Sequence, residues 1–156
     1  MTLAVGDPAP TFSLPSTTGE LSLASLLEGS EKGVIVYFYP AAMTPGCTTQ
    51  ACDFRDSIGS LAGAGYAVVG ISPDPLKRLE EFAARDNLNF PLAADEDHAI
   101  AEAYGAWGEK KNYGKIYEGL IRSTFVVAPD GTLALTQVNV KATGHVGRLR
   151  KILGLD

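Results

Sequence analysis

Two continuous apolar runs alternate along the chain with two stretches in which apolar residues recur at helical spacing. The first run, residues 33–40, is β-branched and aromatic and stops at a proline, and the second run spans Tyr66–Ser72. Such runs predict strands buried on both faces. We place the first strand at the centre of its sheet.

A helix is predicted after each of these strands. The first follows Thr44-Pro45-Gly46 and ends at the Gly63 and Gly65 pair. Its apolar residues, spaced by three and four, are Cys47, Ala51, Phe54, Ile58 and Leu61. The second helix opens at Asp74-Pro75, and its apolar residues are Leu76, Leu79, Phe82 and Ala83. This alternation indicates parallel strands joined by right-handed crossovers.

Shorter elements complete the chain. We expect a short strand at Leu92–Ala94, a helix from about 97 to 104, an antiparallel hairpin of residues 124–128 and 132–138, and a closing helix from about 143 to 153. The order is typical of an α/β sandwich of thioredoxin type with a mixed central sheet. Because no linker or repeat divides it, we expect residues 1–156 to form a single domain.

Residues 106–119 contain several glycines and show no regular spacing of apolar residues, so we expect a surface loop there. Loops of this length often carry function, and the segment is a candidate wall of a site or a partner contact.

The amino-acid composition and net charge argue against several classes of function. The 156 residues are 46% hydrophobic and 20% charged, as in a soluble globular protein. A net charge of −5 argues against nucleic acid or an anionic membrane as partner, and we interpret the basic residues Arg148, Arg150 and Lys151 as a solvated helix end. No secretory signal or membrane-spanning run is apparent, so we expect a cytoplasmic protein.

Cys47 is the strongest candidate for chemistry. Thr44 is a plausible N-cap and Pro45 suits the first helical position, which places Cys47 in the first turn. Free N–H groups and the positive end of the helix dipole favour a thiolate there. The alternative is a small buried apolar cysteine, a common fate of a free cysteine.

The second cysteine, Cys52, lies five residues further on. On an intact helix the two Cα atoms would be about 8–9 Å apart, whereas a disulfide needs less than about 7 Å. A Cys47–Cys52 bond therefore requires at least one helical turn to unwind. This favours a catalytic or sensing disulfide over a permanent structural one.

Other polar residues are weaker candidates. Arg122 interrupts an apolar segment and either reaches solvent from an edge strand or points to the helix start, where it could hold a thiolate. His98 and His145 are interpreted as ordinary surface or partly buried residues. The cysteines and histidines lack zinc-finger spacing, and no glycine fingerprint for a nucleotide is complete, so neither a metal nor another cofactor is expected.

Residues 40–48, Pro40-Ala41-Ala42-Met43-Thr44-Pro45-Gly46-Cys47-Thr48, match the Pro-x-x-x-Thr-x-x-Cys signature of the peroxiredoxins. Together with Cys52, this segment resembles the C-x4-C arrangement of the bacterioferritin-comigratory, or PrxQ, subfamily. Residues 51–56, Tyr113-Gly114-Lys115, residues 122–127 and Asp130-Gly131 resemble later blocks of the same subfamily.

The resemblance implies a thiol-dependent peroxidase acting on hydrogen peroxide and organic hydroperoxides. Cys47 would attack the peroxide and become a sulfenic acid, and Cys52 would resolve it as an intramolecular disulfide. Thr44 would hydrogen-bond the peroxide, Arg122 would stabilise charge, and Pro40 would shield the site. Thioredoxin or a similar dithiol donor would regenerate the enzyme, for which a monomer suffices, although a dimer is not excluded.

Two residues depart from the pattern of the family. Met43 makes the wall after Pro40 more apolar, which favours organic hydroperoxides. Gln50 replaces a glutamate that pairs with arginines in many peroxiredoxins, and it can accept a hydrogen bond but cannot neutralise an arginine.

Two other functions use the same cysteines. A thiol-disulfide oxidoreductase usually shows C-x-x-C, so the spacing disfavours it. A redox-gated sensor or holdase, in which the unwound helix exposes apolar surface to a partner, remains as the alternative of a different class.

Overall fold

The computed structural model describes residues 3–112 and 114–155. The described residues do not include Met1, Thr2, Tyr113 and Asp156. Tyr113 belongs to the Tyr113-Gly114-Lys115 segment that the sequence analysis singled out. The strands are β1 (Ser13–Ser16), β2 (Gly19–Ser22), β3 (Gly33–Phe38), β4 (Tyr66–Ser72), β5 (Leu92–Ala94), β6 (Trp107–Asn112), β7 (Lys115–Leu120), β8 (Ser123–Val127) and β9 (Leu133–Val138). The helices are α1 (Leu23–Glu28), α2 (Pro45–Gly63), α3 (Leu76–Arg85), α4 (Ala99–Ala103) and α5 (His145–Ile152).

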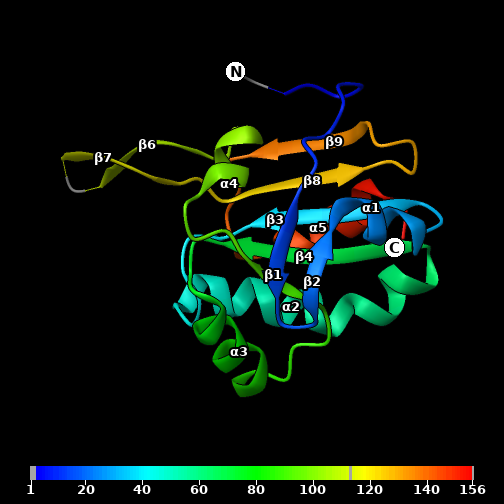
Figure 1. Cartoon of the computed structure of the whole chain (residues 1–156), viewed down its shortest axis with the longest axis horizontal. Helices are drawn as coiled ribbons and strands as arrows, with labels where there is room; N and C mark the ends of the chain where they lie inside the picture. The colour runs from blue at the N-terminus through cyan, green and yellow to red at the C-terminus, as the bar shows by residue number, and fades with distance from the viewer. Residues whose placement is uncertain (1–2, 113, 156) are drawn as a thin grey trace.

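In the described residues, a seven-stranded sheet runs in the order β2-β1-β5-β4-β3-β8-β9 (Figure 1). Strand β3 is parallel to β4 and antiparallel to β8, so the sheet is mixed, as predicted. All six residues of β3 are buried, because helices cover both faces of the sheet. The predicted bounds of β4 and β5 are confirmed, and so is the hairpin of β8 and β9.

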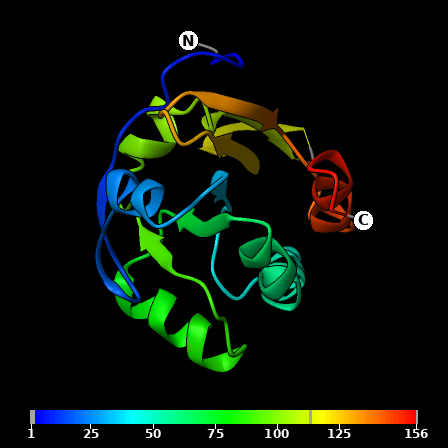
Figure 2. The same ribbon diagram turned by 90° about the vertical axis from the view of Figure 1, so that its right-hand side faces the viewer.

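Two apolar clusters fill the space on either side of the sheet, giving three layers (Figure 2). On one side, α2, α3 and α5 pack against the sheet, and Tyr37 of β3 stacks on Phe54 of α2 with ring centroids 4.5 Å apart. On the other side, Leu23 of α1 and Ala101 of α4 belong to the second cluster. The start of α2 is thereby fixed beside the end of β3.

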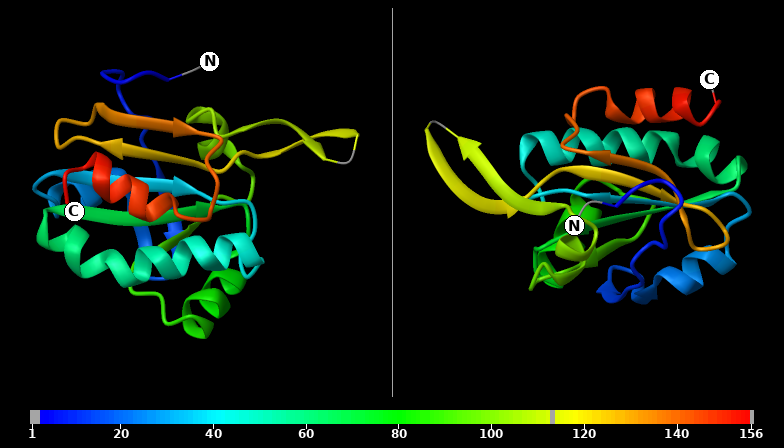
Figure 3. Two further views of the ribbon diagram at one scale, coloured as in Figure 1. Left: turned by 180° about the vertical axis from the view of Figure 1, so that it is seen from behind. Right: turned by 90° about the horizontal axis from the view of Figure 1, so that it is seen from above.

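Three predictions need correction. Residues 106–119 are not a loop: β6 and β7 form an antiparallel hairpin that projects from the body of the molecule (Figure 3). Charged residues stand on both faces of this hairpin, so no apolar alternation marks it in the sequence. Strands β1 and β2 were missed because each has only four residues with few apolar ones, and helix α1 was missed because it has only six residues. Helix α4 is shorter than expected.

Within residues 3–112 and 114–155, none of the helices combines the length and apolarity that crossing a bilayer requires.

Candidate active site

Cys47 lies in the first turn of α2 with only 1% of its surface exposed. The N-cap residue is Thr44 and Pro45 is the first helical residue, as predicted. The Thr44 hydroxyl does not cap the helix but donates a hydrogen bond to the carbonyl oxygen of Ala41 (2.8 Å). Peptide N–H groups of the first turn are thus left to face an anion near the sulfur.

Asp74 holds the loop that carries the site, a role that the sequence analysis missed. Its Oδ2 accepts hydrogen bonds from the Ala42 amide (2.7 Å) and the Ser72 hydroxyl (2.8 Å). Within this loop, Met43 adopts a left-handed backbone with φ of 64°. An aspartate just after β4, beside the end of the parallel strand β3, was the available signal, because the carboxyl ends of such strands share one edge.

Arg122 joins β7 to β8 and points to the start of α2 instead of solvent. Its Nη2 lies 3.3 Å from Cys47 Sγ, and its Nη1 donates a hydrogen bond to Gln50 Oε1. Gly46 makes room for this approach, since a Cβ there would lie 3.4 Å from Arg122 Nη2. The guanidinium therefore contacts both the Cys47 thiol and the side-chain amide of Gln50, which lies about one helical turn further along α2.

Gln50 is fully buried and shares with Cys47 the face of α2 that meets Arg122. Its side-chain oxygen accepts a hydrogen bond from Arg122. The sequence analysis expected this of a glutamine, which can accept a hydrogen bond but cannot neutralise an arginine. Within the part of the chain that the structure describes, its Nε2 is buried without a hydrogen-bond partner. A buried donor without a hydrogen-bond partner costs free energy, so packing alone does not explain a glutamine at position 50.

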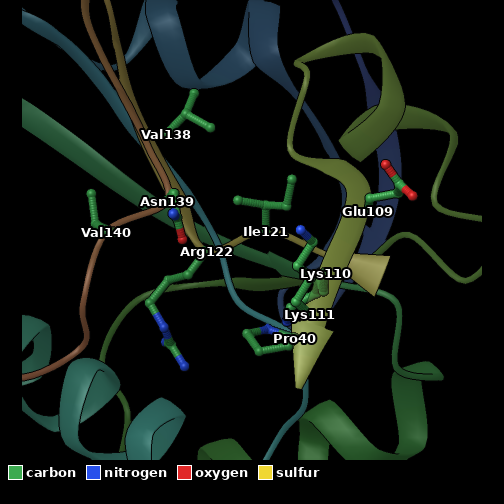
Figure 4. A pocket seen from close by; sticks show the side chains of 9 residues that line it. All are labelled: Pro40, Glu109, Lys110, Lys111, Ile121, Arg122, Val138, Asn139 and Val140. Atoms are coloured by element: carbon green, nitrogen blue, oxygen red, sulfur yellow. The ribbon is translucent and has the colours of Figure 1, made fainter. Parts of the chain in front are cut away.

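A pocket of about 440 Å³ opens beside Arg122 (Figure 4). Its lining residues are Pro40, Glu109, Lys110, Lys111, Ile121, Arg122, Val138, Asn139 and Val140. Pro40 follows β3 and forms part of the wall, while β6 supplies three charged residues. The segment predicted as a candidate wall therefore does contribute to the pocket, although as a strand.

Cys52 occupies a different electrostatic environment from Cys47. It is a half-buried free thiol, and burial together with the carboxylates of Asp86, Asp56 and Asp53 raises its pKa, against an opposing effect of Arg55. Cys47, also a free thiol, faces the Arg122 guanidinium. The two thiols therefore lie in unequal surroundings: a guanidinium lies against Cys47 Sγ, whereas burial and nearby carboxylates raise the pKa of Cys52.

One expectation for the two histidines is wrong. His145 is buried, with 2% exposure, and its Nε2 lies 2.8 Å from Thr124 Oγ1. Burial, with further contributions from Arg148 and Arg122, lowers the pKa of His145 to about 4. His98 is partly exposed and stacks on Trp107 with ring centroids 3.7 Å apart.

Comparison with known proteins shows the same family throughout. The chain matches the AhpC/TSA family over residues 5–136. It is 53% identical over 153 residues to a putative peroxiredoxin of Mycobacterium tuberculosis, with 98% of this chain and 96% of the relative covered. It is 46% identical over 143 residues to peroxiredoxin Bcp of Escherichia coli K12, with 92% and 90% covered. A solved structure of the Xanthomonas campestris bacterioferritin comigratory protein, studied for alkyl peroxide reduction, superimposes with a TM-score of 0.86 at 31% identity, covering 97% of this chain and 98% of that one.

Proposed function

The chain belongs to the peroxiredoxins of the AhpC/TSA family, in the Bcp/PrxQ subfamily, and on that premise we propose that Cys47 and Cys52 are its two redox-active thiols. As a peroxiredoxin it is a thiol peroxidase. The contact of 3.3 Å between Arg122 Nη2 and Cys47 Sγ carries the assignment of Cys47 as the nucleophile.

In the first step, the Cys47 thiolate attacks the terminal oxygen of the hydroperoxide. The O–O bond breaks, the remaining oxygen leaves as water or an alcohol after protonation, and Cys47 becomes a sulfenic acid. Arg122 stabilises the negative charge as it moves from sulfur to the leaving oxygen. Thr44 and the first amides of α2 orient the peroxide, and Pro40 excludes water from the wall of the pocket.

In the second step, the sulfur of Cys52 attacks the sulfenic sulfur and releases water, which leaves a Cys47–Cys52 disulfide. Because α2 is continuous from Pro45 to Gly63, helical geometry separates the two Cα atoms by about 8–9 Å. The disulfide therefore forms only when the first turns of α2 unwind. Thioredoxin or a similar dithiol donor then reduces the disulfide. Because both cysteines belong to the same single-domain chain, one protomer suffices for the cycle. We place the protein in the cytoplasm.

A turnover assay with a dithiol donor tests the two assignments. We expect Cys47→Ser to lose all peroxide turnover, whereas Cys52→Ser retains the first oxidation and accumulates the sulfenic acid. Stopped-flow peroxide consumption measures the first result, and mass spectrometry with a sulfenic-acid trap measures the second. Intact turnover in Cys47→Ser would overturn the function.

The same experiment separates the peroxidase from a redox-gated sensor. Unwinding of α2 would expose Ala51 and Phe54, which are both fully buried in the reduced protein. A sensor would bind a partner only when oxidised and would turn over peroxide no faster with a donor than without one. Sustained donor-dependent turnover assigns the disulfide to catalysis.

A further inference from the structure

The β6–β7 hairpin brings a lysine to the pocket beside Arg122. Alternation along β6 places Glu109 and Lys110 on opposite sides of the strand, as Figure 4 shows. Lys110 is half-buried, whereas Glu109 and Lys111 are exposed. Lys110 and Arg122 both line the pocket, although they come from different elements.

The side chain of Lys110 is held in place by the hairpin itself. Its Nζ donates a hydrogen bond to the carbonyl oxygen of Leu120 (2.8 Å). Its methylene chain passes over Gly119, where a Cβ would lie 3.2 Å from Lys110 Cδ and 3.4 Å from the ring of Tyr117. Tyr117 is the cross-strand partner of Lys110. The glycine thus leaves a channel for the lysine, and the aromatic ring forms its side.

The charge of Lys110 interacts with the reactive centre. Burial and repulsion from Arg122 lower the pKa of Lys110, and attraction to Cys47 opposes them. Among residues 3–112 and 114–155, no carboxylate forms an ion pair with Lys110 or Arg122. A thiolate formed at Cys47 would therefore face both cations without a competing ion pair from a carboxylate.

The other titratable groups around this centre do not replace that anion. Glu109 and Lys111 also line the pocket, but both are exposed to water, which screens their charges. Tyr37 and Tyr39 of the buried β3 segment have pKa values raised by burial, so both phenols stay neutral.

We propose that Lys110 is a positioning residue of the peroxidase site, a second cation that acts through Cys47 and Arg122 to stabilise the thiolate. The inference rests on the proposed role of Cys47 as the nucleophile. It also gives the projecting hairpin a function, because the hairpin carries this charge to a site built by other elements.

The test is a pH profile in a Cys52→Ser background, where Cys47 is the sole thiol. We expect Lys110→Gln to raise the midpoint of Cys47 alkylation by iodoacetamide by about 0.5–1 pH unit, and to slow oxidation by hydrogen peroxide about three- to tenfold at a pH below the midpoint. Lys110→Arg keeps the positive charge, so its alkylation midpoint and its oxidation rate should both lie close to those of the Cys52→Ser parent. Lys115→Gln removes an equal charge from an exposed position outside the pocket and should change neither.

A second variant moves the lysine without removing its charge. Gly119→Ala fills the channel and displaces Lys110, and a smaller shift of the midpoint in the same direction is expected. Far-UV circular dichroism confirms that each variant is folded. An unchanged midpoint in Lys110→Gln, or an equal shift in Lys115→Gln, would overturn the inference. If Cys47→Ser still abolishes turnover in that case, the proposed function stands without it.

Discussion

At the scale of single residues, the site depends on one guanidinium that is held from two sides. Arg122 donates to Gln50 Oε1 through Nη1 and faces Cys47 Sγ through Nη2. Gln50 is fully buried on α2, so the amide that orients the arginine moves together with the thiol. A neutral acceptor also leaves the full positive charge of Arg122 available to a thiolate.

Removing this acceptor should impair the first oxidation. In Gln50→Leu the volume is nearly kept but Arg122 loses its partner, and we expect the rate of Cys47 oxidation to fall about tenfold, as the loss of a hydrogen bond to a charged group predicts. Stopped-flow measurement of the first turnover gives the rate. Gln50→Glu retains an acceptor but adds a negative charge beside Arg122, so comparing the two variants separates the effect of the lost hydrogen bond from that of charge. A rate in Gln50→Leu within about twofold of the wild type would show that Arg122 needs no such support.

Not every residue of the site was visible in the sequence. Cys47 and Arg122 stood out because a thiol after a proline and a charge inside an apolar segment are locally unusual. Asp74 and Lys110 did not, since an aspartate before a proline and a lysine in a polar stretch are ordinary. Their positions follow from which strands lie side by side, and local pattern does not determine that.

At the scale of elements, α2 has two requirements that oppose each other. It must be formed to place Cys47 beside Arg122, and for the proposed disulfide its first turns must open so that Cys52 can reach the same sulfur. The helical pattern was readily predicted because Ala51, Phe54 and Leu61 form a fully buried face. The β6–β7 hairpin was not, since it pairs with itself and has no buried face to impose alternation on the sequence.

Stabilising only the segment that opens should slow disulfide formation. Thr49 is an exposed β-branched residue between the cysteines, and Thr49→Ala should favour the helix by about 0.5 kcal/mol. We expect disulfide closure to slow about twofold and more Cys47 to reach the sulfinic acid at high peroxide, as measured by quenched-flow mass spectrometry.

The matched control lies further along the same helix. Gly59 is an exposed helical glycine with no heavy atom within 4 Å of an added Cβ, so Gly59→Ala also stabilises α2. Disulfide closure in this variant should proceed at the wild-type rate. Equal slowing in both variants would mean that the whole of α2 opens instead of its first turns.

At the scale of the whole molecule, the sheet separates two cores and joins the elements that carry the site. His145 at the start of α5 meets Thr124 of β8, one of the strands next to β3. This buried contact fixes the C-terminal helix to the sheet close to Arg122. Its imidazole is held neutral, because burial lowers its pKa to about 4.

The neutral histidine makes stability depend on pH. The unfolded chain binds a proton at His145 near pH 6.5, whereas the folded chain does so only near pH 4. The free energy of unfolding should therefore fall by roughly 2.5 kcal/mol as the pH drops from about 6.5 to 4, and this contribution is almost fully present above about pH 7. Urea denaturation at several pH values measures the slope. His145→Gln cannot titrate, and the same slope in that variant would exclude His145 as its cause.

The burial of Cys47 has a consequence for which molecules can react with it. Because Cys47 is only 1% exposed, the proposed nucleophile could be reached in this structure by a reactant as small as a hydroperoxide but not by the disulfide of another protein. In the proposed cycle, oxidant and reductant therefore act on different conformations of the same chain, the oxidant on the closed helix α2 and the reductant on the opened one. In that cycle, the fold would keep the two half-reactions in order, and the burial of Cys47 would protect its thiol from forming disulfides with other proteins between turnovers.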